Sequence, residues 1–194
     1  INSLDNIKRV KRVNTFNSDI IKTIYSPYSI YITNPITDDV CFTLLQLLNR
    51  QINQILKNKD FTQHINLYIQ SPGGQLLPTL ALVDEIKNSP VPIWTHIRGY
   101  AASAATLLSV VGDKRYMYNH SLLMVHSVKM DVEVQDLIST KDSYDNLNLF
   151  IDTVTNIYLD NTHLTTDDLN YLFNHNLWIN STKALEYGIV DTIY

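Results

Sequence analysis

The stretch that decides the fold is INLYIQSPGGQLLPTLALVDEI, residues 65–86. Its first six residues, 65–70, are rich in β-forming side chains and predict a strand, and residues 75–88 predict a helix. Between them, Gly73 and Gly74 allow the backbone to turn sharply where the helix begins. A strand followed directly by a helix is the repeating unit of a parallel sheet, so the stretch predicts an α/β fold.

The same alternation of strands and helices continues on both sides of this stretch. We expect further strands at 29–33, 93–97, 115–118, 122–126, 177–179 and 189–193, and further helices at 38–58, 101–111, 136–161, 165–173 and 181–188. Asp38 or Asp39 is the expected N-cap of its helix. Helix 136–161 is longer than a compact domain of this size needs, so it either projects toward another subunit or lies along the surface.

The composition of the chain limits the kinds of function that it can have. A chain of 194 residues is long enough for one domain with a sizeable core, and its net charge of −4 gives no footprint for nucleic acid. It contains no apolar run of the ~18 residues that span a bilayer. The single cysteine, Cys41, excludes an internal disulfide and is expected to be buried in packing. Residues 1–19 are polar and basic, so any targeting segment is expected to have been removed already.

A second glycine-containing stretch, RGYAASAATLL at 98–108, repeats the pattern one unit later. Gly99 allows a turn, and Ser103 lies near the expected helix start, where the helix dipole favours negative charge. Together with SPGG, this arrangement would suit a nucleophile facing an anion hole for a phosphate or an oxyanion. The alternative is structural, a bare turn and close packing of small residues.

A hydrolytic serine needs a base, and His126 is the best placed histidine because it ends the apolar stretch LLMVH. The third member of such a site orients the imidazole and stabilises its cation. Residues 172–182 contain no acidic side chain for that purpose. No group of Cys, His and carboxylate residues has the spacing of metal ligands, so neither a metal nor an organic cofactor is expected.

Five motifs in this order resemble the proteolytic subunit of the Clp protease, the ClpP family: SPGG, GYAAS, KRY, MVH and ALEYGIVD. The resemblance runs from about residue 19 to the end of the chain, which leaves 1–18 as an N-terminal extension or axial segment. It implies the ClpP/crotonase-type α/β spiral of βαβ units, as a single domain over 19–194 with a projecting handle at about 127–161. Members of the family form rings of seven subunits that pair into a barrel.

The resemblance also assigns roles to residues. Ser103 matches the nucleophile, His126 matches the general base, and Gly74 and Ala104 match the residues whose backbone N–H groups form the oxyanion hole. The position of the family's third member, an aspartate, is Asn176 here. A neutral amide cannot stabilise an imidazolium as a carboxylate does; in one serine protease the same replacement lowers turnover about 10⁴-fold.

Another departure follows the histidine, where HSVKMDVEVQ (126–135) has no glycine or proline in place of the family's glycine-rich, peptide-binding stretch. Such departures resemble ClpR, the non-catalytic or weakly active paralogue of plastids and cyanobacteria. A ClpR-type structural subunit is therefore the favoured interpretation. An active ATP-dependent serine endopeptidase using Ser103 and His126 is the alternative. A third interpretation, acyl-CoA chemistry of the crotonase type, fits the serine–histidine pair less well.

Partners follow from the resemblance alone. It implies a homo-heptamer or a mixed ring with ClpP subunits, a Clp-type AAA+ ATPase docked on the ring face, and unfolded protein or peptide substrates. Tyr68 matches one position of the docking pocket, although it could equally be an ordinary sheet residue, and Asn66 replaces an aromatic residue at another. No nucleic acid and no membrane is expected as a partner. The ClpR-like departures and an AT-rich compositional bias favour a plastid-type organelle, apicoplast or chloroplast stroma, over the cytoplasm or the mitochondrial matrix.

Overall fold

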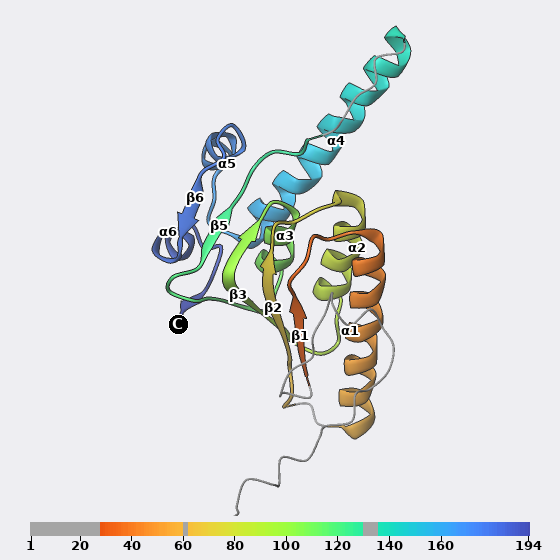
Figure 1. Ribbon diagram of the computed structural model, residues 1–194, viewed down its shortest axis with the longest axis vertical. Coiled ribbons are helices and arrows are strands. Elements are labelled where there is room, and N and C mark those ends of the chain that lie inside the picture. The colour runs from red at the N-terminus through yellow and green to blue at the C-terminus, as the bar shows by residue number, and fades with distance from the viewer. Residues whose placement is uncertain (1–27, 60–61, 130–135) are drawn as a thin grey trace, which may run out of the picture.

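The computed structural model describes residues 28–59, 62–129 and 136–194 (Figure 1). The predicted N-terminal extension, 1–18, lies outside the described residues. Within the described ranges the elements are β1 (Ser29–Ile32), α1 (Asp38–Asn58), β2 (Ile65–Ser71), α2 (Leu76–Lys87), β3 (Ile93–Ala102), α3 (Ala104–Val110), β4 (Lys114–Met117), β5 (Leu122–Met124), α4 (Leu137–Asn161), α5 (Thr166–Phe173), β6 (Trp178–Asn180), α6 (Ser181–Glu186) and β7 (Thr192–Ile193).

One largely parallel sheet organises the chain, as the alternating pattern predicts. Its main path runs β1-β2-β3-β4-β7, and every pair along that path is parallel. Strand β5 pairs with the second half of β3, and β6 adds to β5 as the antiparallel edge. The fold is therefore the mixed α/β architecture that the sequence indicates.

Helices cover one face of this sheet. Alternate residues of β2 and β3 point toward the helices, and among them Ile65, Leu67 and Ile97 are buried. The hydroxyl of Thr95 on the same face donates a 2.7 Å hydrogen bond to the carbonyl of Ser109 in α3. In Figure 1, α1 and α2 stand side by side against the sheet, and α3 lies behind β3. The carboxyl ends of β2, β3 and β5 meet at one edge, where ligand sites form in such folds.

Strand β3 is longer than predicted, and the expected helix at 101–111 begins later. The strand runs over Ile93–Ala102 because its two halves pair with different strands, residues 94–97 with β4 and residues 100–102 with β5. Gly99, with φ of 84°, lies where the pairing changes. Sheet contacts on both edges thus override the helix propensity of the alanines.

Two further predictions are wrong in detail. The N-cap of α1 is Thr37 rather than Asp38 or Asp39, because the Thr37 hydroxyl accepts the Val40 N–H at 3.4 Å. The two aspartates instead occupy the first helical turn, where negative charge is favourable. Strand β5 ends at Met124, so His126 lies beyond the strand and not at its end.

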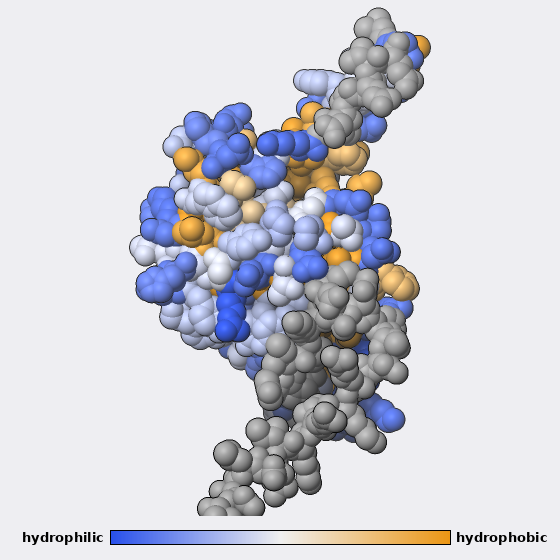
Figure 2. Space-filling view, viewed as in Figure 1, coloured by the Kyte–Doolittle hydropathy of each residue, from blue (hydrophilic) through white to orange (hydrophobic). Residues whose placement is uncertain are grey.

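The long helix α4 does project from the domain (Figure 1). Its carboxyl half is anchored by the buried side chains of Val154 and Tyr158. Near its amino end Ile138 is 74% exposed, and at its middle Leu149 is 60% exposed. Figure 2 shows hydrophobic residues gathered where this helix meets the domain. The helix is therefore held at one end and leaves apolar side chains unpacked at the other.

Candidate active site

Ser103 lies in the turn between β3 and α3. Its φ of 54° is in the left-handed region, which a residue other than glycine adopts only when its surroundings impose it. Its backbone N–H donates to the Met124 carbonyl at 2.8 Å, and its carbonyl accepts from the Thr106 hydroxyl at 2.6 Å. The Ser103 side chain makes no capping hydrogen bond. The backbone is thus held on both sides while the hydroxyl stays available.

The SPGG turn packs directly against this serine. A Cβ on Gly73 would lie 2.6 Å from the Ala102 carbonyl oxygen and 2.8 Å from the Ala104 nitrogen, so no larger residue fits. The turn is fixed from its other side, where the Ile36 N–H donates to the Gly73 carbonyl at 2.8 Å. The glycines therefore permit a close approach of two backbone segments, in addition to a sharp turn.

The two predicted oxyanion donors lie in one cavity of about 260 Å³ with Ser103. The turn is hydrogen-bonded to Ile36 through the Gly73 carbonyl and the Gln75 N–H. The N–H of Gly74 takes no part in these bonds and has no acceptor in the described part of the chain. The N–H of Ala104 likewise has no acceptor among the described residues. Both donors are thus free to bind an anion beside the serine.

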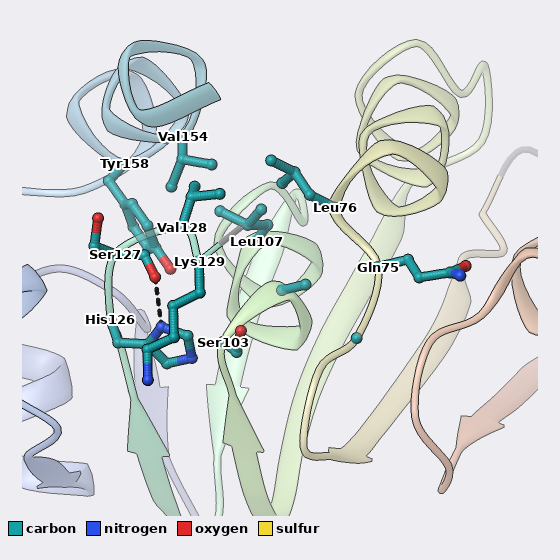
Figure 3. A pocket seen from close by; sticks show the side chains of 12 residues that line it. Gln75, Leu76, Ser103, Leu107, His126, Ser127, Val128, Lys129, Val154 and Tyr158 are labelled. Carbon is teal, nitrogen blue, oxygen red and sulfur yellow. Dashed lines mark hydrogen bonds between the residues drawn. The ribbon is translucent and has the colours of Figure 1, made fainter. Parts of the chain in front are cut away.

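His126 reaches the same cavity from the segment after β5 (Figure 3). Its Nδ1 lies 2.6 Å from the Ser127 carbonyl oxygen. Since a carbonyl only accepts, Nδ1 carries the proton and Nε2 is left with a lone pair. In Figure 3 the second ring nitrogen lies on the side of the ring toward Ser103. No hydrogen bond joins the two side chains in this conformation.

Asn176 is exposed and does not line the cavity. In the β5–β6 ladder, Leu122 faces Asn180 and Met124 faces Trp178. Continued by two residues, this register sets position 176 opposite His126, although the regular ladder ends before it. Among the described residues no carboxylate lies within 4.0 Å of the His126 ring nitrogens, and none lines the cavity.

Apolar side chains form much of the remaining wall. Leu76, Leu107, Val128 and Val154 line it, with Lys129 as its charged member. Tyr158 is fully buried and its hydroxyl is hydrogen-bonded to the Thr106 hydroxyl. Burial raises the pKa of Tyr158 far above its ordinary value, so it stays protonated and does not act as a base. The cavity suits an apolar side chain of a peptide placed beside the serine.

Comparison with known proteins agrees with this geometry. The family model described as Clp protease matches residues 12–194. The chain belongs to the Clp protease family.

Clp protease subunits from distant organisms are similar to this chain over most of its length. The ATP-dependent Clp protease proteolytic subunit of Cyanophora paradoxa is 28% identical over 172 residues, which cover 85% of this chain and 83% of the relative. The subunit of the same name from Oenothera elata is 28% identical over 90% of this chain and 70% of the relative. The ATP-dependent Clp protease proteolytic subunit 2 of Corynebacterium glutamicum is 25% identical over 92% of this chain and 87% of the relative.

In this Clp protease chain, Tyr68 belongs to a larger aromatic feature that the sequence analysis missed. We call it the aromatic stack; it consists of the rings of Tyr31, Tyr68, His96, Tyr116 and Tyr194. Successive ring centroids are 4.6, 4.5, 4.9 and 5.0 Å apart. The signal was present in the sequence, because each of the first four strands in the sheet path has a ring flanked by residues that point to the opposite face.

Within the described residues, neither a metal site nor a membrane span is found. Over the described ranges, no three His, Cys, Asp or Glu side chains gather closely enough to hold an ion. Over the same ranges, no helix is both long and apolar enough to cross a bilayer. Cys41 is buried as predicted, and its thiol donates to the Pro78 carbonyl.

Proposed function

We propose that this chain is a ClpR-type ring subunit of an ATP-dependent Clp protease, with a peptidase centre that is non-catalytic or weakly active. The single observation that carries the proposal is the partner of His126. Its Nδ1–H is bound by the Ser127 carbonyl, and the residue at the family's aspartate position is the amide Asn176.

The chemical consequence follows from the charge that develops during acylation. Ser103 would attack a peptide carbonyl while His126 takes the hydroxyl proton on Nε2 and becomes a cation. A carbonyl dipole holds the ring in the required tautomer, but it stabilises that cation less than a full negative charge does. The oxyanion donors at Gly74 and Ala104 remain usable, so binding of an acyl group is retained better than turnover.

The test is the reactivity of Ser103 in the purified chain. We expect slow labelling by a fluorophosphonate probe and little cleavage of short fluorogenic peptides. Any labelling should disappear in Ser103→Ala, whereas Ser109→Ala, at a buried serine of α3, should leave it unchanged provided that the variant folds. Rapid labelling that Ser103→Ala abolishes would overturn the proposal.

An active serine endopeptidase is the second candidate, and one observation favours it. The carbonyl of Ser127 selects the tautomer of His126 that can accept the serine proton, which a donating amide would not do. The same labelling experiment separates the two candidates, because an active enzyme reacts rapidly and cleaves peptides without further substitution.

We further propose that the chain assembles as a homo-heptamer or in mixed rings with ClpP subunits. The exposed apolar side chains of α4 support an interface at the projecting helix, since apolar patches on a surface mark contact sites. The names of the relatives include the word ATP-dependent, which supports a Clp-type AAA+ ATPase as partner and unfolded protein or peptide as substrate. Tyr68, half-buried in the aromatic stack, would be part of the docking face.

A plastid-type organelle is the compartment we propose. Support comes from the ClpR-like departures and from the similarity to subunits of Cyanophora paradoxa and Oenothera elata. Co-localisation of the tagged full-length gene product with a plastid marker is expected, and a purely cytoplasmic or mitochondrial signal would exclude it.

A further inference from the structure

The cavity around Ser103 contains one charged side chain that the proposed reaction does not use. Lys129 lines the cavity together with His126. His126 carries its proton on Nδ1 and is neutral, so Lys129 is the only lining residue with a full charge. In Figure 3 the side chain of Lys129 runs from the apolar wall in the direction of the His126 ring. The chain thus adds a cation to the cavity that would receive a peptide.

No negative group of the cavity balances this cation. In the described part of the chain Lys129 forms no ion pair, and none of the residues that line the cavity is acidic. Lys141 and Lys183 show the contrast, since each forms an ion pair with a carboxylate of its own helix, at 3.2 and 2.8 Å. The unpaired backbone N–H groups of Gly74 and Ala104 are two further hydrogen-bond donors in the same cavity. The cavity therefore favours a ligand with negative charge.

The wall beside Lys129 is apolar and limits the kind of anion that fits. Leu107 of α3 and Val154 of α4 line it, and so does Val128, the residue before the lysine. Methylene groups pack favourably against such a wall, and a carboxylate is the natural partner of an ammonium group. A glutamate side chain supplies both, whereas a purely apolar side chain leaves the ammonium without an anionic partner.

We infer that Lys129 determines specificity, so that the cavity prefers a peptide with glutamate as the residue whose carbonyl lies at Ser103. The inference rests on the proposed function in one respect, since it takes the cavity as the peptide site of a peptidase centre. The peptide carbonyl oxygen accepts hydrogen bonds from Gly74 and Ala104, and the glutamate carboxylate pairs with Lys129. Because Lys129 is exposed, salt screens the pair and the preference is modest.

The experiment measures binding by the full chain with isothermal titration calorimetry at low salt. It compares acetyl-Gly-Leu-Glu-amide with its Gln counterpart, which has the same shape and no charge. We expect the Glu peptide to bind about threefold more tightly, and the ratio to fall toward one at high salt. The amide cap removes the C-terminal carboxylate from both peptides, so the difference reports the side chain.

Three variants assign the preference to Lys129. Lys129→Gln should make the two affinities equal. Lys129→Glu should reverse the selection, so that a Lys counterpart of the peptide binds more tightly than the Glu peptide, which a loss of packing alone would not produce. Lys57→Gln removes the same charge from an exposed position of α1 and should leave the ratio of the Glu and Gln peptides unchanged.

Equal binding of the Glu and Gln peptides by the unsubstituted chain, binding of neither, or a preference that survives Lys129→Gln would each overturn the inference. A preference that is also lost in Lys57→Gln would assign it to the net charge of the chain and overturn it as well. Affinity is measured without turnover, whereas the proposed function is judged by the labelling rate of Ser103, so the two can fail separately.

Discussion

On the serine side of the candidate active-site cavity, two backbone segments touch at Gly73 and Ala104 with no space for another atom. On the histidine side, His126 lies two residues beyond the end of β5, and its proton is bound by the carbonyl of the next residue. The serine side is built from backbone held by the sheet. The histidine side lies past the regular β5–β6 ladder, and its one described hydrogen-bond partner is the Ser127 carbonyl.

This difference teaches which part of a serine-protease site survives change at single residues. Backbone N–H donors at Gly74 and Ala104 persist as long as the fold does, because any residue type supplies them. The charge beside the imidazole is lost with a single substitution. A subunit can therefore keep the shape and anion-binding groups of the site while its base is weakened.

The largest effect is expected from breaking the serine side with Gly73→Ala. Its Cβ would lie 2.6 Å from a backbone oxygen at a φ of 88°, so either the turn or Ser103 must move. We expect the free energy of unfolding to fall by about 4 kcal/mol, measured by urea denaturation.

Gly99→Ala is the matched control, because it has a similar φ of 84° but its nearest neighbour, at 3.3 Å, is the flexible side chain of Gln70. It should cost about 1–2 kcal/mol. Equal losses in the two variants would mean that the positive φ, and not the close approach, requires glycine at Gly73.

The next effect concerns the histidine side, where Asn176→Asp restores a carboxylate at the position opposite His126. If the side chain reaches the ring, stabilisation of the imidazolium should raise cleavage of a fluorogenic peptide at least about tenfold. Asn180→Asp is the control on the same strand, since aspartate caps α6 as asparagine does. No gain in Asn176→Asp would place the defect in the groove or in assembly.

The smallest effect concerns the aromatic stack, in which the buried His96 makes the free energy of unfolding depend on pH. Burial, and then the nearby charge of His64, lower the pKa of His96 to about 4. The Nε2 of His96 is hydrogen-bonded to Oδ1 of Asn66, and among the described residues its buried Nδ1 has no partner. The rings of Tyr68 and Tyr116 stack on its two faces.

The unfolded chain binds this proton near pH 6.5 and the folded chain does not, so stability is full above about pH 6.5 and falls as the pH drops toward about 4. A loss of about 1–2 kcal/mol between pH 7 and pH 4.5 is expected after allowance for solvent screening. His96→Phe should flatten this part of the curve, and an unchanged pH dependence would assign it to other groups.

Much of the fold follows from the sequence because hydrophobic periodicity and glycine positions are local signals. The β2–SPGG–α2 unit and the helix α4 were predicted to within about two residues. The extent of β3 was not, since it depends on pairing with β4 and then β5, which no local pattern encodes. The Thr37 cap was missed because the aspartates beside it are equally good caps by type.

The candidate site likewise has a part that the sequence predicts and a part that it does not. Ser103, His126, Asn176, Gly74 and Ala104 were predicted as one group. The structure places four of them around one cavity, whereas Asn176 is exposed and does not line it. The Ser127 carbonyl could not be predicted, since every residue has a carbonyl and only the local backbone conformation brings this one to His126. The aromatic stack also depends on strand order, which sets Tyr68 beside His96.

Strand β3 carries His96 near its middle and ends one residue before Ser103, with neighbours hydrogen-bonded along both of its edges. A strand that is hydrogen-bonded along both edges resists bending, so a displacement at the aromatic stack would also displace Ser103. Gly99, with a φ of 84°, lies where the pairing partner of β3 changes. A change in backbone flexibility at Gly99 would alter how strongly a displacement at the aromatic stack is transmitted to Ser103.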